Sequence, residues 1–194
     1  MHILLAITGA SGSVYAIRLL EELAKKQQPV TVVLSDNGVS VTEFETGVHC
    51  DQNYLQSLAK KSSSHIMLAR NSDLWACASS GSSAPDAMVI VPCSMGTIGR
   101  IAHGISGTLI ERAADVMLKE RKPLIVVPRE TPFSSIHLTN MLTLTQAGAE
   151  IIPACPGFYH RPTQLHEVID FMVGKILDRL KIEHTLVARW QGNQ

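Results

Sequence analysis

Short apolar runs alternate along the chain with longer segments in which apolar residues repeat every three or four positions. Runs such as VTVVL and LIVV are apolar throughout, which is typical of strands that helices cover on both faces. Their alternation with helical segments is typical of βαβ units around a parallel sheet. We therefore predict an α/β fold with helices on both faces of the sheet. The expected strands cover residues 2–7, 30–35, 87–92, 124–128 and 150–153.

Two regions depart from this alternation. Residues 47–85 are polar and rich in small side chains, so we predict a less regular insertion that contains one short helix. Near the C-terminus, apolar residues from Leu165 to Leu180 repeat at helical spacing, which predicts an amphipathic helix with Thr163 as its N-cap. Lys175 lies at one edge of the apolar stripe, where its ammonium group can extend into solvent or reach a site.

The length of 194 residues fits one domain, and 45% hydrophobic with 18% charged residues is typical of a folded chain. Lys and Arg (17) balance Asp and Glu (17), so the chain lacks the positive field of a duplex-DNA-binding protein. The N-terminal residues lack the basic region and long apolar run of a secretion signal, and nowhere do about 18 uninterrupted apolar residues occur. We expect a cytoplasmic protein that binds neither nucleic acid nor membranes.

The cysteine and histidine spacings match no metal site. The four cysteines are far apart, without a CxxC pair, and the eight histidines form no HxxxH or HExxH pair. We therefore expect no bound metal, and reduced thiols as in cytosolic proteins. Cys93 adjoins an expected strand, so we expect it to be an inert packing residue rather than a nucleophile.

Two turns rich in small and hydroxylated residues follow expected strands. The first, TGASGS at residues 8–13, precedes a helical segment whose free N–H groups and positive dipole end suit a phosphate. The second, PCSMGT at residues 92–97, precedes a helix that we expect to continue towards Lys119. Both turns would lie at the carboxyl edge of one sheet, where open α/β folds bind ligands. A tight turn with a serine cap explains the first equally well, and it matches neither a nicotinamide nor an ATP motif.

Three further segments carry side chains suited to chemistry. Arg129 and Glu130 follow the fourth expected strand, where an arginine can bind an anion bidentately and an acid can exchange protons with a substrate. A structural ion pair between the two is the alternative. The cations of residues 112–122 are diluted by acids, as on a solvated helix face. In the loop of residues 156–162, Tyr159 can donate to a phosphate or simply pack, and His160 can act as a base.

Taken together, these segments resemble one family. The resemblance to the UbiX-type flavin prenyltransferases covers the whole chain and rests on the blocks TGASG, VPCSMGT, RAADVMLKER, VPRETP, PGFYHRP and ARWQG. It implies a single flavodoxin- or Rossmann-like domain over residues 1–194, whose C-terminal helix and tail take part in oligomer contacts. It also implies a metal-independent prenyltransferase of ubiquinone biosynthesis that assembles as a homododecamer.

The implied reaction joins dimethylallyl monophosphate to reduced FMN. The isoprenoid alkylates flavin N5 and closes through C6 into a fourth ring, and the prenylated FMN then serves a UbiD-type decarboxylase. The resemblance assigns flavin binding to Gly9, Ala10, Ser11, Ser35, Ser94, Met95, Thr97 and Arg129. It assigns binding of the isoprenoid phosphate to Arg112, Lys119, Tyr159 and Lys175. Glu45, Glu130 and Lys119 are the implied catalytic residues, and Trp190 is either a cation–π partner of the allylic group or an interface anchor.

Two other functions remain open on these motifs. The flavin-dependent cysteine decarboxylases share the fold, but they carry an asparagine that orients the substrate carboxylate where this chain has Gly96. A flavin carrier or accessory subunit of a decarboxylase would need no second phosphate site, which argues against that role. Lys175 stands where the resembled family often has arginine, which exchanges a bidentate contact for a point charge.

Overall fold

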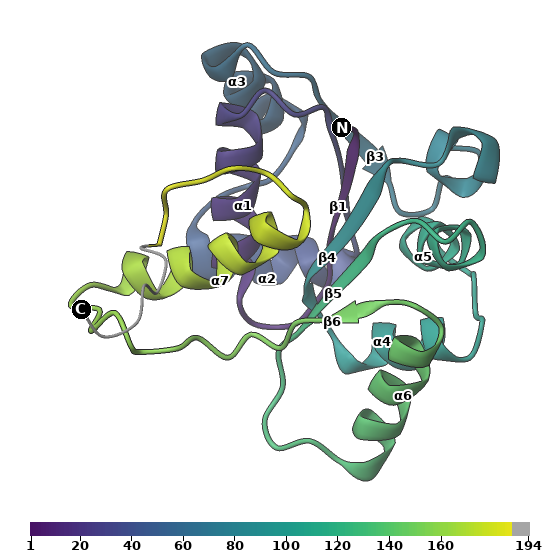
Figure 1. Cartoon of the computed structure of the whole chain (residues 1–194). Helices are drawn as coiled ribbons and strands as arrows, with labels where there is room; N and C mark the ends of the chain where they lie inside the picture. Colours follow the sequence, from purple (N-terminus) through teal and green to yellow (C-terminus); the bar gives the residue numbers. More distant parts are fainter. Residues whose placement is uncertain (188–194) are drawn as a thin grey trace.

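The computed structural model describes residues 1–187, in which six parallel strands form the central sheet (Figure 1). The strand order is β3-β2-β1-β4-β5-β6, and each neighbouring pair is parallel. The predicted α/β fold is therefore confirmed. The strands are β1 (Ile3–Ile7), β2 (Val30–Leu34), β3 (Ile66–Arg70), β4 (Ala87–Cys93), β5 (Leu124–Pro128) and β6 (Glu150–Ile151).

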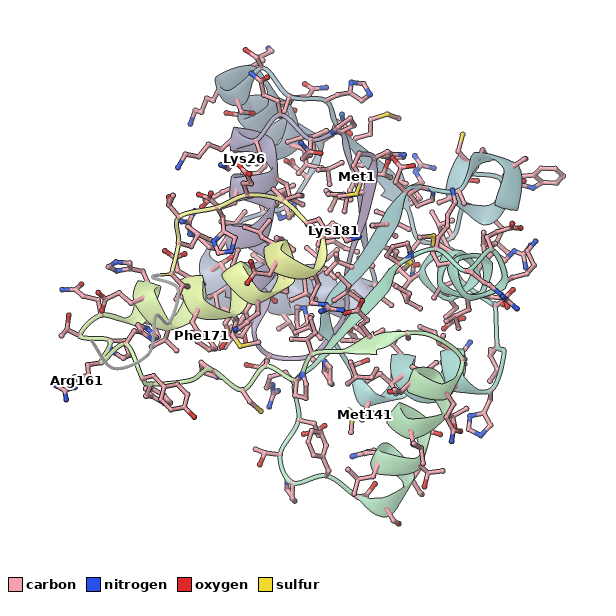
Figure 2. The ribbon with its side chains drawn as sticks, viewed as in Figure 1. Met1, Lys26, Met141, Arg161, Phe171 and Lys181 are labelled. Atoms are coloured by element: carbon pink, nitrogen blue, oxygen red, sulfur yellow. The ribbon has the colours of Figure 1, made fainter. Side chains whose placement is uncertain are left out.

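Helices cover both faces of the sheet, and apolar side chains fill the space between the layers (Figure 2). Ile3, Leu5 and Ile7 of β1 belong to a core with α1 and α7, whereas Leu4 and Ala6 belong to a second core with α4 and α5. Because side chains alternate along a strand, a strand buried on both faces must be apolar throughout. The helices are α1 (Ser13–Lys25), α2 (Asp36–Thr46), α3 (Gln52–Ser62), α4 (Met95–Ala102), α5 (Leu109–Lys119), α6 (Ser135–Gln146) and α7 (Leu165–Arg179), with short 3₁₀ turns η1 (Cys77–Ser79) and η2 (Gly81–Ser83).

The chain order reverses between the two central strands, because β1 leads to β2 on one side and β4 leads to β5 on the other. Open α/β sheets bind ligands outside the carboxyl ends of the strands at such a switch point. Buried Thr8 joins the two strands there. Its Oγ1 donates to the main-chain oxygen of Pro92 at 2.9 Å and accepts from the N–H of Ser94 at 2.8 Å. The turns after β1 and β4 are thus held side by side.

The helix predicted within residues 47–85 is present as α3, but the prediction missed the strand β3. β3 pairs in parallel with β2 at the edge of the sheet. Of its residues only Ile66 is buried, and Met67 is 51% exposed. An edge strand that is covered incompletely lacks the all-apolar signal that marks the central strands.

The helix expected to run from the second turn to Lys119 is two helices, α4 and α5. Gly104 follows α4 with φ +68°, and Thr108 begins a new helix by accepting from the N–H of Glu111. The N-cap of α7 is Gln164 rather than Thr163, because the Glu167 carboxylate accepts from the N–H groups of both residues. Most of the other boundaries differ from the predicted ones by one or two residues.

The cysteine thiols Cys50, Cys77, Cys93 and Cys155 are free. Burial raises the pKa of Cys50 to about 11 and also raises the pKa of Cys93, which disfavours the thiolate that a nucleophile requires. Within the described part of the chain, no set of three or more His, Cys, Asp or Glu side chains is arranged to hold a metal ion. Across the same residues, no helix is both long and apolar enough to cross a membrane.

Candidate active site

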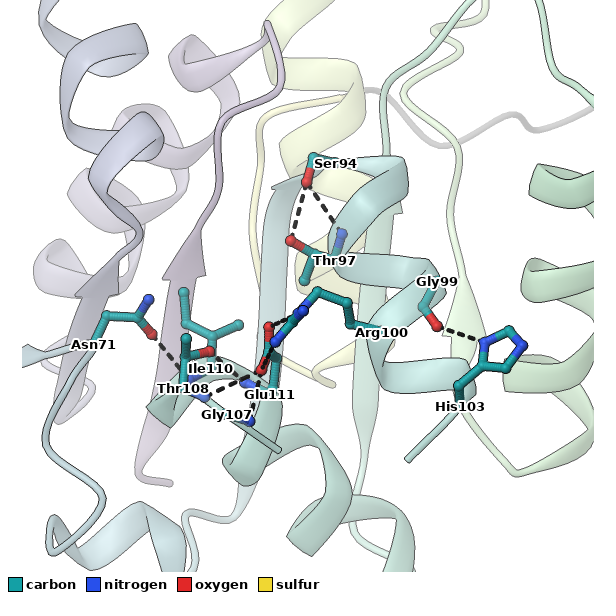
Figure 3. Close-up of polar contacts among 10 residues, drawn as sticks. All are labelled: Asn71, Ser94, Thr97, Gly99, Arg100, His103, Gly107, Thr108, Ile110 and Glu111. Carbon is teal, nitrogen blue, oxygen red and sulfur yellow. Dashed lines mark hydrogen bonds and ion pairs between the residues drawn. The ribbon is translucent and has the colours of Figure 1, made fainter. Parts of the chain in front are cut away.

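Two serines cap the helices that begin at the carboxyl edge of the sheet. Ser35 Oγ accepts from the N–H of Gly38 at 3.0 Å at the start of α2. Ser94 Oγ accepts from the N–H of Thr97 at 3.3 Å and lies 3.0 Å from Thr97 Oγ1 at the start of α4 (Figure 3). All three hydroxylated residues are only half-buried. A capping oxygen still carries its own O–H proton, so these side chains can donate to a ligand.

The turn after β1 lies against the start of α2. A Cβ atom at Gly9 would lie 2.4 Å from Cβ of Asn37, so a larger residue would push the two segments apart. Gly9 and Ser11 are exposed, whereas Ala10 is buried, as is Met95 in the turn after β4. The two buried side chains serve the core, so their contribution to a ligand is limited to main-chain groups.

The N-terminus of α1 is occupied by a carboxylate of the same chain. Glu45 Oε2 accepts from the N–H groups of Gly12 at 2.9 Å and Ser13 at 2.8 Å. Burial opposes ionisation of Glu45, but hydrogen bonds from Ser11, Gly12 and Ser13 and the charge of Arg129 outweigh it, so its pKa lies below the usual range. Two of the N–H groups that the sequence offers to a phosphate therefore hold an internal anion.

Arg129 joins the end of β5 to the first turn, because its Nε donates to the main-chain oxygen of Ser11 at 3.0 Å. Its terminal nitrogens make no hydrogen bond within residues 1–187, which leaves them available to an anion. Glu130 Oε1 accepts from the N–H of Thr131 at 3.0 Å. The alternative of an ion pair between Arg129 and Glu130 is not realised in the described structure.

Arg112 and Lys119 lie on one face of α5, about two turns apart. Arg112 is half-buried, and its Nε donates to the main-chain oxygen of Ser79 at 3.1 Å while Nη1 donates to Asp115 Oδ2 at 2.8 Å. Lys119 is exposed, with Nζ 3.0 Å from Glu120 Oε1. In the single chain, Lys119 therefore lies on a solvated helix face, whereas Arg112 is held by its hydrogen bonds to Ser79 and Asp115.

The N-terminus of α5 is anchored near the carboxyl edge of the sheet (Figure 3). Asn71, which follows β3, accepts from the N–H of Leu109 at 2.7 Å and, through Oδ1, from the N–H of Ile110 at 3.1 Å. Arg100 of α4 forms an ion pair with Glu111 of α5. This pair joins the helix after the β4 turn to the helix that carries Arg112 and Lys119. The C-terminal end of α5 lies about 15 Å further along the helix axis.

Lys175 lies on the opposite face of the sheet from α5. Its helix, α7, packs on α1 and belongs to a different core from α5 (Figure 1). Lys175 is exposed, and Tyr159, in the loop before α7, is 83% exposed. A single chain therefore does not bring Arg112, Lys119 and Lys175 together. The predicted role of Trp190 falls outside the described residues.

Sequence reasoning missed two residues of this region. Thr8 was included only as part of a turn, although its buried hydroxyl connects the turns after β1 and β4. Phe171 received no role, although its ring lies under the ammonium group of Lys175, with Nζ 5.5 Å from the ring centroid. The spacing of Phe171 and Lys175 could have predicted their contact, because residues four apart on a helix are neighbours on its surface.

Comparison with known proteins identifies the family. The flavoprotein family model matches residues 1–191. The chain is 46% identical over 195 residues to the flavin prenyltransferase UbiX of Pseudomonas aeruginosa, which covers 97% of this chain and 93% of the relative. The crystal structure of AnUbiX in complex with FMN and dimethylallyl pyrophosphate is 38% identical with a TM-score of 0.91, and the match covers 100% of this chain and 98% of that one.

Other solved structures separate family from fold. A dodecameric FMN-dependent UbiX-like decarboxylase from Escherichia coli O157:H7 is 35% identical with a TM-score of 0.90, covering 99% of this chain and 100% of that one. An FMN-dependent cysteine decarboxylase of thioviridamide biosynthesis is only 17% identical, with a TM-score of 0.59 and coverage of 78% and 89%, and shares the fold alone. The chain belongs to the flavoprotein family and, within it, to the UbiX-type flavin prenyltransferases.

Proposed function

We propose that this protein is a flavin prenyltransferase that joins dimethylallyl monophosphate to reduced FMN. The observation that carries the proposal is the group of polar side chains at the switch point between β1 and β4. There the capping serines Ser35 and Ser94, the guanidinium group of Arg129 and the ionised Glu45 surround the turns of one sheet edge. Membership in the UbiX-type flavin prenyltransferase family supports the same function.

The residues present fit a flavin. The half-buried hydroxyls of Ser35, Ser94 and Thr97 and the exposed main chain of Gly9 offer hydrogen bonds to a phosphate and to ring heteroatoms. The guanidinium group of Arg129 adds a positive charge beside them, with its terminal nitrogens unused within residues 1–187. Reduced FMN, when bound there, would supply the nucleophilic ring atoms N5 and C6.

The donor phosphate requires concentrated positive charge and hydrogen-bond donors as it leaves. We assign this function to Arg112, Lys119 and Lys175 with the hydroxyl of Tyr159. Loss of the phosphate leaves positive charge on the isoprenoid carbon, which a fixed anion stabilises. Glu45 is suited to this function, because its hydrogen bonds and its low pKa keep the carboxylate charged at neutral pH.

A proton must leave the flavin ring when the second bond forms. Glu130 lies half-buried beside Arg129, and its carboxylate accepts one main-chain hydrogen bond within the described structure. Its remaining lone pairs can accept that proton. We therefore assign Glu130 the role of proton relay and Arg129 that of flavin binding.

The active site is completed in a homo-oligomer, which we propose to be a dodecamer. The separation of α5 and α7 on opposite faces supports sites shared between subunits. Helix α6 supports extensive contacts, because its Ile136, Leu138 and Leu142 are 69%, 54% and 57% exposed. Apolar side chains gathered on one exposed helix are typical of an association surface. We expect the C-terminal helix and tail, including Trp190, to contribute to the same assembly.

The product would serve a UbiD-type decarboxylase as its cofactor, and we expect both proteins to act in the cytoplasm. The free thiols of the four cysteines are consistent with a reducing compartment. A role as a cysteine decarboxylase is disfavoured because no amide side chain is present at Gly96, where a Cβ atom would meet no other atom within 4 Å.

Mass spectrometry of the extracted flavin tests the proposal. The purified protein is incubated anaerobically with FMN, a reductant and either dimethylallyl monophosphate or dimethylallyl pyrophosphate. We expect prenylated FMN with the monophosphate, and none when the reductant is omitted. Unmodified FMN with both donors would exclude prenyltransferase activity and favour a role as an accessory flavin carrier. Activation of a UbiD-type decarboxylase by the same mixture would then test the carrier role.

A further inference from the structure

The ring of Phe171 makes three contacts that join α7 to the loop before it. Lys175 Nζ lies 5.5 Å from the ring centroid, within the range of a cation–π interaction. On the loop, the His160 ring stacks on Phe171 with centroids 5.6 Å apart and planes 2° from parallel. A Cβ atom at Gly157 would lie 3.0 Å from Phe171 Cζ and 3.4 Å from a ring carbon of Tyr159. The loop therefore lies directly against Phe171.

His160 is held by this stack rather than by hydrogen bonds. Both of its ring nitrogens are buried, and neither has a hydrogen-bond partner among residues 1–187. An imidazole that exchanges protons with a substrate must reach it directly or through one water. A ring with buried nitrogens that is stacked on Phe171 is better suited to packing than to the base function that the sequence also allowed.

We propose that Phe171 is a positioning residue for the donor phosphate. Its ring holds the ammonium group of Lys175, and through His160 and Gly157 it holds the loop that carries Tyr159. One apolar ring would thus set the separation of two phosphate-binding groups that come from different segments. This inference rests on the proposed function, because Lys175 and Tyr159 are assigned to the phosphate there.

The physical reason for such a ring is conformational entropy. Lys175 and Tyr159 are both exposed, and an exposed lysine loses up to about 2 kcal/mol of rotamer freedom when it is immobilised. An ammonium group is a point charge without the planar fork of arginine, so the lysine alone does not set a direction. A ring that already holds the group lowers the cost of ordering it on a phosphate. Figure 2 shows Phe171 on α7, on the same side of the molecule as Arg161 of the loop.

Substitutions of Phe171 separate this role from simple packing. Phe171→Leu keeps an apolar side chain and removes the π face, so we expect the KM for dimethylallyl monophosphate to rise roughly fivefold. The affinity for FMN should change less than about twofold. Phe171→Tyr keeps the π face, so its KM for dimethylallyl monophosphate should equal that of the wild-type protein. Phe158→Leu is the matched control, because it removes the 64%-exposed ring of Phe158 from the same loop without touching the stack.

A second pair of variants tests the stack through His160. His160→Phe keeps a stacking ring and should retain both kcat and the donor KM, whereas His160→Ala should raise the donor KM as Phe171→Leu does. A large loss of kcat in His160→Phe with an unchanged KM would show acid–base chemistry at His160 and overturn the proposal. An unchanged donor KM in Phe171→Leu, or an equal loss of FMN affinity, would overturn it as well.

The geometry can also be tested without activity. The ring current of Phe171 should shift the ring-proton NMR signals of His160 upfield, and Phe171→Leu should abolish this shift. If the wild-type protein makes no prenylated FMN, the proposed function fails whatever the NMR result. If it does make prenylated FMN, and the donor KM of Phe171→Leu is unchanged, only the positioning role fails.

Discussion

The turns that we assign to the flavin and the groups that we assign to the donor phosphate are built in different ways. The flavin turns follow buried strands, and their side chains are held by main-chain groups, as with Ser35 on Gly38 N–H and Ser94 on Thr97 N–H. The donor group consists of side chains on separate segments, and Lys119 and Lys175 are exposed on opposite faces of the sheet. On these assignments, one chain preorganises the flavin contacts, whereas we expect the donor contacts to depend on assembly.

This difference means that the affinities for the two ligands should depend on different parts of the structure. Affinity for FMN should follow local capping and the strand ends, which one folded subunit already provides. Affinity for the isoprenoid phosphate should follow the relative placement of α5 and α7, which one subunit does not provide. Variants that affect one ligand and spare the other can therefore test the comparison directly.

Disruption of the α6 surface should have the largest effect. We expect the double substitution I136D/L138D to dissociate the oligomer, because it places charges in an apolar surface that an interface would bury. Product formation should fall at least about 100-fold. FMN affinity should change less than about fivefold, if the flavin turns are complete within one subunit. Analytical ultracentrifugation, flavin titration and product analysis measure the three quantities.

Gln56→Asp is the control for this variant, because it adds a charge at an exposed polar position of α3, outside the α6 surface. It should retain both assembly and activity. A dissociated I136D/L138D protein that still forms product at the wild-type rate would show that one chain holds the complete donor site. That outcome would break the comparison between the two regions.

Removal of one donor cation should have the next largest effect. Lys119→Ala removes a charge that we assign to the phosphate, so the KM for dimethylallyl monophosphate should rise about 10- to 30-fold, the equivalent of about 1.5–2 kcal/mol. FMN affinity should stay nearly unchanged. Lys60→Ala, on the exposed surface of α3, is the control for a general change of charge and should affect neither ligand. Equal losses for both ligands would place Lys119 outside the donor site.

Loss of one cap should have a smaller effect, and on the other ligand. Ser94→Ala removes the N-cap of α4 and one hydroxyl from the flavin turn, so FMN affinity should fall about 5- to 10-fold, with about 1 kcal/mol of stability. The donor KM should not change. Ser134→Ala is matched to it, because Ser134 caps α6 by accepting from the N–H of His137. It should lose similar stability and keep its FMN affinity.

The sequence predicted the placement of the turns after β1 and β4 better than the relative placement of the groups assigned to the donor, because the turns depend on local sequence. The strand runs and the residues after them, such as TGASGS and PCSMGT, are consecutive in the chain, so their placement follows from the parallel sheet. The relative placement of Arg112 and Lys175 depends on which face of the sheet each helix covers, and spacing along the chain does not encode this. Sequence alone also left open the stack of Phe171 with His160, which depends on how the loop folds back on α7.

Local physical features explain the remaining errors. Residues 66–70 form an edge strand with mixed burial, so the apolar pattern that marks β4 and β5 is absent. The contact of Glu45 with the N–H groups of Gly12 and Ser13 joins residues more than 30 positions apart, so no local sequence motif predicts it. The sequence therefore offered the end of α1 as a phosphate site, while the folded chain places a carboxylate there.

Glu45→Gln tests the flavin side of the comparison through stability, where its effect should be no larger than that of Ser94→Ala. The amide keeps the shape of the side chain but loses the charge that faces the N–H groups of Gly12 and Ser13. We expect a loss of about 1 kcal/mol in the free energy of unfolding at pH 7, since Glu45 is half-exposed and solvent screens part of the interaction.

The pH dependence of that loss identifies its cause. The pKa of Glu45 is lower in the folded chain than its ordinary value, so the carboxylate stabilises the fold at pH values above the unfolded pKa of about 4.3. This contribution is lost as the pH falls through the lower, folded pKa. The difference in unfolding free energy between wild type and Glu45→Gln should therefore be constant near neutral pH and shrink below about pH 4.3, which urea titrations at several pH values can measure. A difference that is the same at pH 3 and pH 7 would mean that the amide disturbs packing, and that the charge of Glu45 contributes nothing to holding the first turn.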